Sequence, residues 1–277
     1  MKKLFIILLL LFFAVSNTQN RTWIDSYTSN WEKFEGGTKL MANNDNWLPI
    51  TFVLDYHPEN LKADKLNGTY VVVPPRTKNY EVVRFDKIDK SKGWKFKKGN
   101  TRTYLGDLTD TEYDENYIYD LPFETNKSFK IGQGYNGNIS HQNKFALDFD
   151  MPVNTKVLAC RDGIVVQVVK KNSKRCNEPK CAEFNNLVKI LHDDGTIMQY
   201  LHFRQNGVRV RLGQKVSKGQ LIGLSGNVGW STAPHLHVDL YLTDKNNKYK
   251  TLRTKFKINK NDIVDELNKG QTYLKGY

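Results

Sequence analysis

The chain has 277 residues, enough for two small domains, and 39% of its residues are hydrophobic. Its formal net charge of +13 favours an anionic polymer as a partner. Beyond the N-terminal apolar run, no segment is long and apolar enough to predict a membrane span, which excludes a protein with several transmembrane helices.

Residues 1–19 have the layout of a secretory signal peptide. Met1-Lys2-Lys3 precedes an apolar run from Leu4 to Val15, and Ala14-Val15-Ser16 resembles a small-x-small cleavage site. The run is short for a membrane span, so an uncleaved anchor is the minority alternative. The sequence predicts export to the periplasm or the cell exterior, with membrane contact only through the signal peptide. Export argues against nucleic acid as the partner of this basic chain.

Residues 20–125 carry the pattern of a small β-sandwich. Short β-prone runs alternate there with turn signals such as Asn67-Gly68. The predicted strands are Ile50 to Leu54, Thr69 to Val73, Tyr80 to Phe85, Trp94 to Phe96 and Tyr117 to Tyr119. This spacing predicts an accessory domain that resembles an immunoglobulin sandwich but lacks its cysteine pair. Leu121-Pro122-Phe123 marks the predicted boundary.

Residues 126–277 are also rich in β signals, so the predicted fold class is all-β. The predicted strands are Ile164 to Val169, Leu187 to Leu191, Thr196 to Tyr200, Val208 to Val210 and Val238 to Leu242. One short helix is predicted at Ile263 to Leu267, capped by Asn261 or Asp262 and ended by Gly270. A basic C-terminal extension begins near Asp244.

Four of the six histidines and one aspartate form the most informative pattern. His235 and His237 lie one residue apart in an apolar run, so on a strand both imidazoles share a face. His141 and Asp148 precede or enter a second apolar run, and His202 follows a third. Convergent imidazoles and a carboxylate can bind a metal, and a base beside the metal can activate water. One alternative is that these histidines are core or surface residues. The other is a structural metal site without catalytic function, although closed structural sites normally use four protein ligands.

These motifs resemble those of the lysostaphin/LytM-type zinc endopeptidases, which cut bacterial cell-wall peptide. The family pattern is a His…Asp pair, a later Tyr-x-His, and a glycine-rich run that closes on His-Leu-His. Here it reads His141…Asp148-Phe149-Asp150-Met151-Pro152, then Tyr200-Leu201-His202, Gly213 to Gly229, and His235-Leu236-His237. The match covers roughly residues 130 to 242.

The resemblance implies that His141, Asp148 and His237 hold one Zn²⁺ per chain. It implies that His202 and His235 are the catalytic pair, without saying which of them is the base. The implied fold is an open β-barrel or sandwich of the murein endopeptidase type, with a duplicated hybrid motif and the zinc in a groove.

With export, the resemblance implies a zinc metalloendopeptidase that hydrolyses peptide bonds of peptidoglycan through a zinc-activated water. One alternative is a catalytically silent regulatory module that activates another cell-wall hydrolase. The other is a zinc protease that acts on proteins. The peptide bond that is cut, the role of the N-terminal half and the oligomeric state are left open.

Two positions depart from the family pattern. The spacing between His141 and Asp148 is longer than usual, which predicts a looped entry before the strand. Asp150 shares a strand face with Asp148 and is a possible substitute ligand, but Asp148 keeps the following Met-Pro in register. Asn154 replaces a common glycine at a predicted turn, where asparagine tolerates positive φ.

The remaining cysteines and histidines have structural interpretations. Cys176 and Cys181 bracket a polar loop and predict a local disulfide in an oxidising compartment. Cys160 lies in an apolar run and predicts a buried free thiol. His192 lies between a strand and a turn, which favours a structural role, and His57 is a predicted surface residue.

Overall fold

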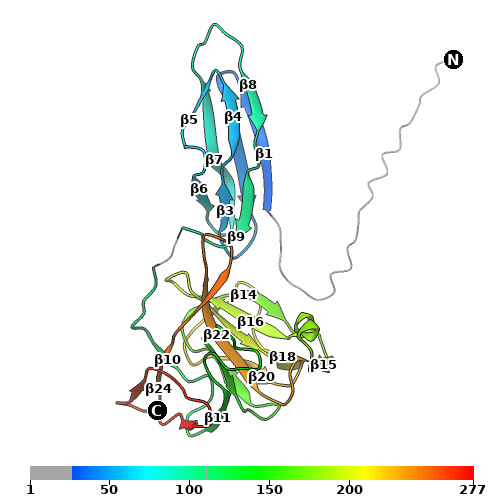
Figure 1. The fold of residues 1–277 in the computed structure, drawn as a ribbon, viewed down its shortest axis with the longest axis vertical. Coiled ribbons are helices and arrows are strands. Elements are labelled where there is room, and N and C mark those ends of the chain that lie inside the picture. Colours follow the sequence, from blue (N-terminus) through cyan, green and yellow to red (C-terminus); the bar gives the residue numbers. More distant parts are fainter. Residues whose placement is uncertain (1–26, 110–111) are drawn as a thin grey trace, which may run out of the picture.

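The computed structural model describes residues 27–109 and 112–277 as two lobes built almost entirely of β-strands (Figure 1). The all-β class is confirmed, and the one helical element among the described residues is the 3-10 helix η1 (Pro179–Phe184). The predicted signal peptide at residues 1–19 lies outside the described residues. Within the described ranges, no helix is long and apolar enough to cross a membrane.

The first lobe packs three small sheets around one core. Its strands are β1 (Tyr27–Phe34), β2 (Gly37–Asn44), β3 (Ile50–Val53), β4 (Tyr56–Glu59), β5 (Leu61–Ala63), β6 (Tyr70–Val73), β7 (Thr77–Lys87), β8 (Lys95–Lys98) and β9 (Arg102–Leu105). The sheet orders are β1-β2-β7-β5, β6-β3-β9 and β4-β8. Phe52, Val73 and Phe85 are buried where these sheets meet. The immunoglobulin-like classification stays a prediction.

The second lobe is built around a nine-stranded sheet in the order β19-β14-β16-β17-β22-β12-β11-β26, with β23 also paired to β22. The strands of this lobe are β10 (Ile118–Asp120), β11 (Ser128–Gln133), β12 (Ala146–Phe149), β13 (Lys156–Leu158), β14 (Gly163–Val169), β15 (Arg175–Cys176), β16 (Leu187–Leu191), β17 (Ile197–Leu201), β18 (Phe203–Val208), β19 (Lys215–Val216), β20 (Leu221–Ser225), β21 (Gly229–Trp230), β22 (Leu236–Thr243), β23 (Tyr249–Leu252), β24 (Lys255–Lys257), β25 (Ile263–Val264) and β26 (Thr272–Leu274). A three-stranded sheet, β13-β20-β18, closes the core from the other side.

One strand predicted for the first lobe lies in the second. β10 pairs in parallel with β24, and Tyr119, Leu121 and Phe123 are buried in the second core. The boundary predicted near residue 125 therefore falls inside the second lobe. The chain leaves the sheets of the first lobe after β9, and the partner of β10 comes more than a hundred residues later.

The helix predicted at Ile263 to Leu267 is wrong. Ile263 and Val264 form β25, which pairs with β24, and Leu267 is fully buried in the second core. A helical signal of about one turn is weak, because short helices gain little from propensity alone. The strand pairing and the burial of Leu267 decide the conformation instead.

Alternation along β22 gives the large sheet two different faces. Leu236, Val238 and Leu240 are buried in the core on one face. His237, Asp239 and Tyr241 therefore point to the opposite face, because successive side chains of a strand alternate.

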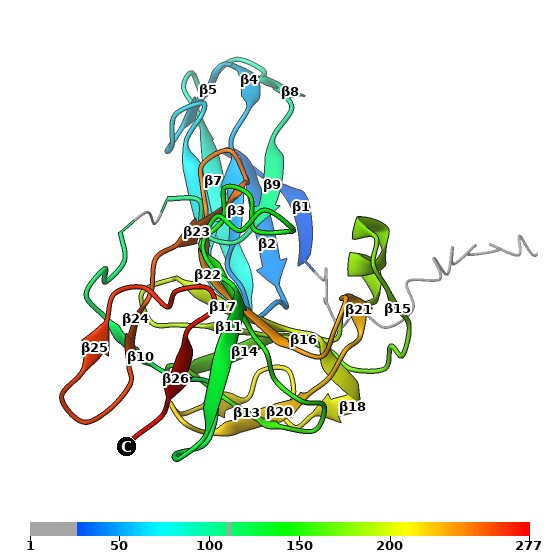
Figure 2. The ribbon, with the colours of Figure 1, turned by 60° about the horizontal axis from the view of Figure 1, so that its bottom comes forward.

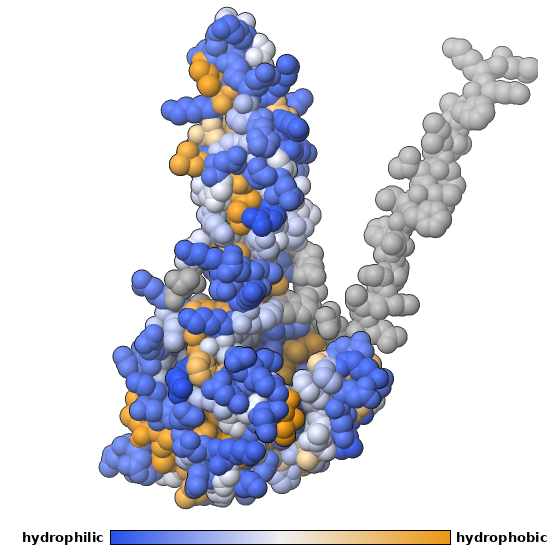
Figure 3. Space-filling model, viewed as in Figure 1, coloured by the Kyte–Doolittle hydropathy of each residue, from blue (hydrophilic) through white to orange (hydrophobic). Residues whose placement is uncertain are grey.

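The first lobe packs against the same face of the sheet. Leu48 of the first lobe is buried with Val166, Ile197 and Tyr241 of the second. The hairpin of β22 and β23, orange in Figure 1, reaches up to this junction. Elsewhere the surface seen in Figure 3 is mostly hydrophilic, with scattered apolar patches. The first lobe thus covers one end of the sheet face that carries His237.

Candidate metal site and cleft

Strand pairing brings Asp148 and His237 together. Asp148 of β12 lies directly opposite His237 of β22, and Leu201 at the end of β17 lies opposite His237 on its other side. Directly opposite residues of antiparallel strands have Cβ atoms about 5 Å apart. The alternation that faces His237 away from the core therefore also positions the carboxylate beside it.

His141 reaches the same point from a loop. The segment between β11 and β12 folds back on itself, with Asn143 at φ 57° and the His141 carbonyl accepting from the Lys144 N–H. His141 is fully buried. The looped entry predicted from the long spacing between His141 and Asp148 is the feature that allows both to converge.

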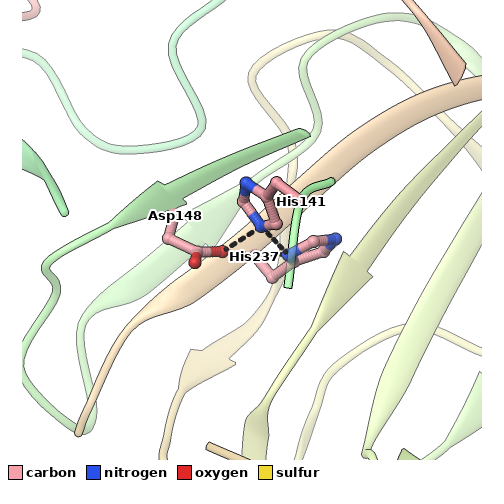
Figure 4. A group of neighbouring side chains, drawn as sticks. All are labelled: His141, Asp148 and His237. Carbon is pink, nitrogen blue, oxygen red and sulfur yellow. Dashed lines mark hydrogen bonds and ion pairs between the residues drawn. The ribbon is translucent and has the colours of Figure 1, made fainter. Parts of the chain in front are cut away.

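Three ligand atoms meet at the centre of this site (Figure 4). His237 Nδ1 lies 2.9 Å from Asp148 Oδ1, His141 Nε2 lies 3.3 Å from the same oxygen, and the two nitrogens are 3.2 Å apart. Ligand atoms about 2.0–2.1 Å from a tetrahedral metal would be about 3.3 Å from one another. The triangle of His141, Asp148 and His237 therefore has the size of one face of a tetrahedral site.

The outer ring nitrogens fix which lone pairs face the centre. His141 Nδ1 lies 3.0 Å from the Gly134 carbonyl, which can only accept, so Nδ1 donates and Nε2 carries a lone pair. His237 Nε2 lies 3.3 Å from Asp239 Oδ2, which leaves a lone pair on Nδ1. Two nitrogen lone pairs and one carboxylate oxygen then point at one another. A cation between them resolves this repulsion, so the donor set fits a metal ion.

The electrostatics of the site also attract positive charge. Although burial raises it, the adjacent imidazoles of His141 and His237 hold the pKa of Asp148 well below its usual range. Although burial lowers it, hydrogen bonds to Asp148 and Asp239 raise the pKa of His237 to about 10. The negative charges of Asp148 and Asp239 therefore favour a cation at this point.

His202 and His235 face the same cleft from its other wall. His202 Nδ1 donates to the Val228 carbonyl at 2.8 Å, and His235 Nδ1 donates to the Ala233 carbonyl at 2.8 Å. Their Nε2 atoms are therefore acceptors, and the two ring centroids are 4.5 Å apart. His235 Nε2 lies 3.8 Å from Asp148 Oδ1, next to the three convergent atoms.

The environment of His202 keeps its ring neutral. Burial, followed by electrostatic interaction with His235 and His237, lowers the pKa of His202 to about 3. Its backbone is left-handed, with φ 71°, a conformation that costs a non-glycine residue energy and often marks a functional position.

A disulfide-bearing segment supports the cleft wall that holds His202. The predicted disulfide between Cys176 and Cys181 is present, and Cys160 is a buried free thiol as predicted. β15 pairs in parallel with β21, which begins one residue after Val228. Figure 2 shows η1 and β15 beside β21 at the edge of the lobe. Ala182 of η1 and Trp230 of β21 both line the cleft, whose volume is about 330 Å³.

The other residues considered in the sequence lie outside the convergent group. Asp150, the possible substitute ligand, is exposed and its Oδ2 lies 3.6 Å from Lys130 Nζ, outside the convergent group. Asn154 has φ 73°, which confirms the turn. His192 is buried outside the cleft, with Nδ1 2.6 Å from the Asp162 carbonyl, and His57 is exposed.

Two residues that hydrogen-bond the candidate metal ligands were not identified from the sequence. Gln133 Nε2 donates to Asp148 Oδ2 at 2.9 Å, and Asp239 accepts from His237. Asp239 could have been found, because it is two residues after His237 on the same strand face. Gln133 carries no such local signal, since it comes from the end of β11.

Several known proteins are similar to this chain. The family described as Peptidase family M23 matches residues 142–250, which include every predicted site residue except His141. An uncharacterized metalloprotease of Buchnera aphidicola subsp. Baizongia pistaciae is 30% identical over 53% of this chain and 38% of its own length. The peptidoglycan DD-endopeptidase ShyA of Vibrio cholerae is 43% identical over 34% of this chain and 19% of its own.

Among solved structures, lysostaphin from Staphylococcus simulans aligns at 30% sequence identity over 43% of each chain, with a TM-score of 0.33. The chain spans less than two fifths of the length of either curated relative.

Proposed function

We propose that this chain is an exported zinc metalloendopeptidase that hydrolyses peptide bonds of bacterial peptidoglycan, since residues 142–250 match the model of peptidase family M23. The observation that carries the proposal is the convergence of His141, Asp148 and His237 on one point of an open cleft. The similarity to ShyA, a peptidoglycan DD-endopeptidase, supports the choice of substrate class.

His141, Asp148 and His237 would hold the zinc. Two imidazoles and one carboxylate are a ligand set of catalytic zinc sites, which keep one position open for water or substrate. The chemistry that the metal supplies at these residues is activation of water and polarisation of the scissile carbonyl. Gln133 and Asp239 orient the ligands through their hydrogen bonds to Asp148 and His237.

His202 and His235 would carry out the proton transfers. Both present an Nε2 lone pair to the cleft, and the neutral ring of His202 can accept a proton at neutral pH. Once protonated, either imidazolium can stabilise the developing oxyanion or protonate the leaving amine. The backbone carbonyls of Val228 and Ala233 keep both rings in the required tautomer.

Export is the second part of the proposal. The signal-peptide pattern at residues 1–19 and the basic composition support it. The Cys176–Cys181 disulfide supports it independently, because stable disulfides are typical of oxidising compartments outside the cytosol.

The test is digestion of purified sacculi with and without a zinc chelator, with the released muropeptides identified by mass spectrometry. We expect chelator-sensitive products, whose masses identify the bond that is cut. His237→Ala should lose both stoichiometric zinc and activity. Asp148→Asn should lose zinc, whereas Asp150→Asn should retain it.

Two outcomes would overturn the proposal. Full zinc content and activity in His237→Ala would remove the metal-site assignment. A folded, zinc-loaded protein that releases nothing from sacculi would point to a regulatory module if it stimulates another hydrolase, or to a protein substrate if it cleaves a protein panel.

A further inference from the structure

A row of polar side chains crosses the sheet floor beside the metal site. Lys189 of β16 lies opposite Gln199 of β17, and Gln199 lies opposite Asp239 of β22. Directly opposite residues point to the same face of a sheet. Asp239 shares that face with His237, which precedes it by two residues. The row therefore lies on the cleft side of the sheet and leads away from the metal site.

A second pocket opens over this row. Its volume is about 270 Å³, and its lining includes Lys144, Lys189, Gln199, Asp239, Tyr241 and Tyr249. We call it the lysine pocket. Lys144, Gln199 and Asp239 also line the cleft, so the two spaces are contiguous. A peptide bound at the metal site can therefore extend into the lysine pocket.

The charges of the lysine pocket favour an anion. Lys189 is only 7% exposed, and its Nζ lies 5.3 Å and 5.4 Å from the ring centroids of Tyr241 and Tyr249. Lys144, which also lines the pocket, is exposed. The carboxylate of Asp239 accepts from Gln199 Nε2 at 3.2 Å and from His237 Nε2 at 3.3 Å. Two lysine side chains and one carboxylate, that of Asp239, thus line the pocket, so positive charge predominates in its lining.

We propose that the lysine pocket binds a free carboxylate of the substrate peptide through Lys144 and Lys189. The inference rests on the proposed peptidase function and adds a determinant of specificity to it. Peptides with a terminal or side-chain carboxylate that reaches this pocket are preferred over the same peptides with that group amidated. Charge-assisted hydrogen bonds in a partly buried pocket give this discrimination.

The test compares matched cross-linked peptides of the kind that sacculus digestion releases. The substrate is prepared in four forms: unmodified, amidated at the C-terminus, amidated at side-chain carboxyls, and amidated at both. We expect amidation of the recognised carboxylate to raise KM about tenfold, with kcat little changed. The form that shows the rise identifies the carboxylate as terminal or side-chain.

Variants assign the effect to the pocket. Lys189→Met and Lys144→Gln should raise KM for the unmodified peptide and show little further rise on amidation, whereas Lys189→Arg should keep most of the discrimination. Lys250→Gln is the matched control, because Lys250 is exposed on β23 and alternates with Tyr249 and Thr251, which line the pocket. Should Lys189→Met fail to fold, the exposed Lys144→Gln carries the test.

Equal cleavage of all four forms would overturn the lysine pocket while leaving the peptidase function intact. The same conclusion would follow if amidation raised KM equally in the wild type and in both variants. Failure of the wild type to cleave any form would instead contradict the proposed function.

Discussion

Each histidine of the cleft donates a hydrogen bond to a protein acceptor from one ring nitrogen and presents the other nitrogen to the cleft. The outer nitrogens of His141, His202 and His235 donate to backbone carbonyls, and that of His237 donates to Asp239. A carbonyl or carboxylate acceptor fixes the tautomer, because it cannot donate. The motif supplies the imidazoles, whereas these acceptors decide which nitrogen is available for chemistry.

Among the four groups that accept from the outer ring nitrogens, Asp239 is the only side chain, so its contact can be removed by mutation. Asp239→Asn keeps the side-chain volume but replaces the carboxylate beside His237 Nε2 by a neutral amide. We expect the zinc Kd to rise roughly 10- to 100-fold, as is usual for loss of such a supporting carboxylate. Competition with a fluorescent chelator measures it. An unchanged Kd would show that the contact with Asp239 does not support the ligand.

His192 gives a prediction about stability rather than activity. Burial lowers its pKa to about 4, against about 6.5 in an unfolded chain. Between these values the unfolded state binds more protons, so stability falls as pH decreases from about 6.5 to 4 and is unaffected by this group above that window. The full effect is about 3 kcal/mol.

Urea unfolding at pH 7, 6, 5 and 4.5 measures this loss. His192→Phe should be less stable at pH 7, because the hydrogen bond to the Asp162 carbonyl is lost, but its stability should fall less steeply on acidification. Parallel curves for the wild type and His192→Phe would contradict the assignment.

At the scale of elements, the short strand β15 links a disulfide to the wall of the cleft that holds His202. β15 pairs with β21, and the Gly229 N–H donates to the Lys174 carbonyl. The Ser231 N–H donates to the Cys176 carbonyl. Val228, which anchors His202, directly precedes Gly229. The loop between Cys176 and Cys181 therefore supports the wall of the cleft from outside.

Removal of this disulfide should weaken both the fold and the cleft wall. The double variant Cys176→Ser/Cys181→Ser should lose about 2 kcal/mol of unfolding free energy, the amount expected for closing so short a loop. We also expect a rise in KM that exceeds the fall in kcat, since Trp230 and Ala182 line the cleft rather than bind the metal.

Reductant provides the matched comparison for this prediction. Dithiothreitol should reproduce the effect in the wild type and in Cys160→Ala, whose free thiol is buried, but not in the double serine variant. A double variant with wild-type kinetics would show that β21 holds its position without the disulfide.

Local patterns predicted many strands of both lobes but could not give their partners. The runs at 50–54, 187–191 and 238–242 coincide closely with β3, β16 and β22, because period-2 alternation and β propensity are local properties. The pairing of β10 with β24 joins segments from distant parts of the chain. The helix prediction at 263–267 was wrong for the same reason, since the pairing of β25 with β24 overrides a weak local preference for helix.

At the scale of the whole molecule, the first lobe and the candidate metal site share one face of the large sheet. Tyr241 and His237 lie on the same side of β22, and Tyr241 packs against Leu48 of the first lobe. The two main cores are otherwise separate. The junction around Leu48 is therefore a small apolar contact between two independently packed lobes.

Leu48→Lys should uncouple the lobes without unfolding either. Leu48 is 5% exposed and belongs to the junction rather than to either main core, so a lysine there would place a charge in an apolar contact. We expect a larger radius of gyration by small-angle X-ray scattering, with unchanged strand content by circular dichroism. Leu66→Lys is the control, because Leu66 is 80% exposed. An unchanged radius of gyration would mean that other contacts fix the lobes.

The candidate site residues could be chosen from local patterns alone. His141, Asp148, His202, His235 and His237 could be selected by spacing, because motif spacing and strand alternation depend on near neighbours. The turn at Asn154, the disulfide and the buried thiol of Cys160 were predictable on the same local grounds.

The contacts that support those residues, and the groups that lie beside them, follow from the three-dimensional fold. The contact of Gln133 with Asp148, the anchoring carbonyl of Val228 and the row of Lys189, Gln199 and Asp239 each join different segments of the chain. Strand register fixes these contacts, and register is set by packing across the whole sheet rather than by any one segment.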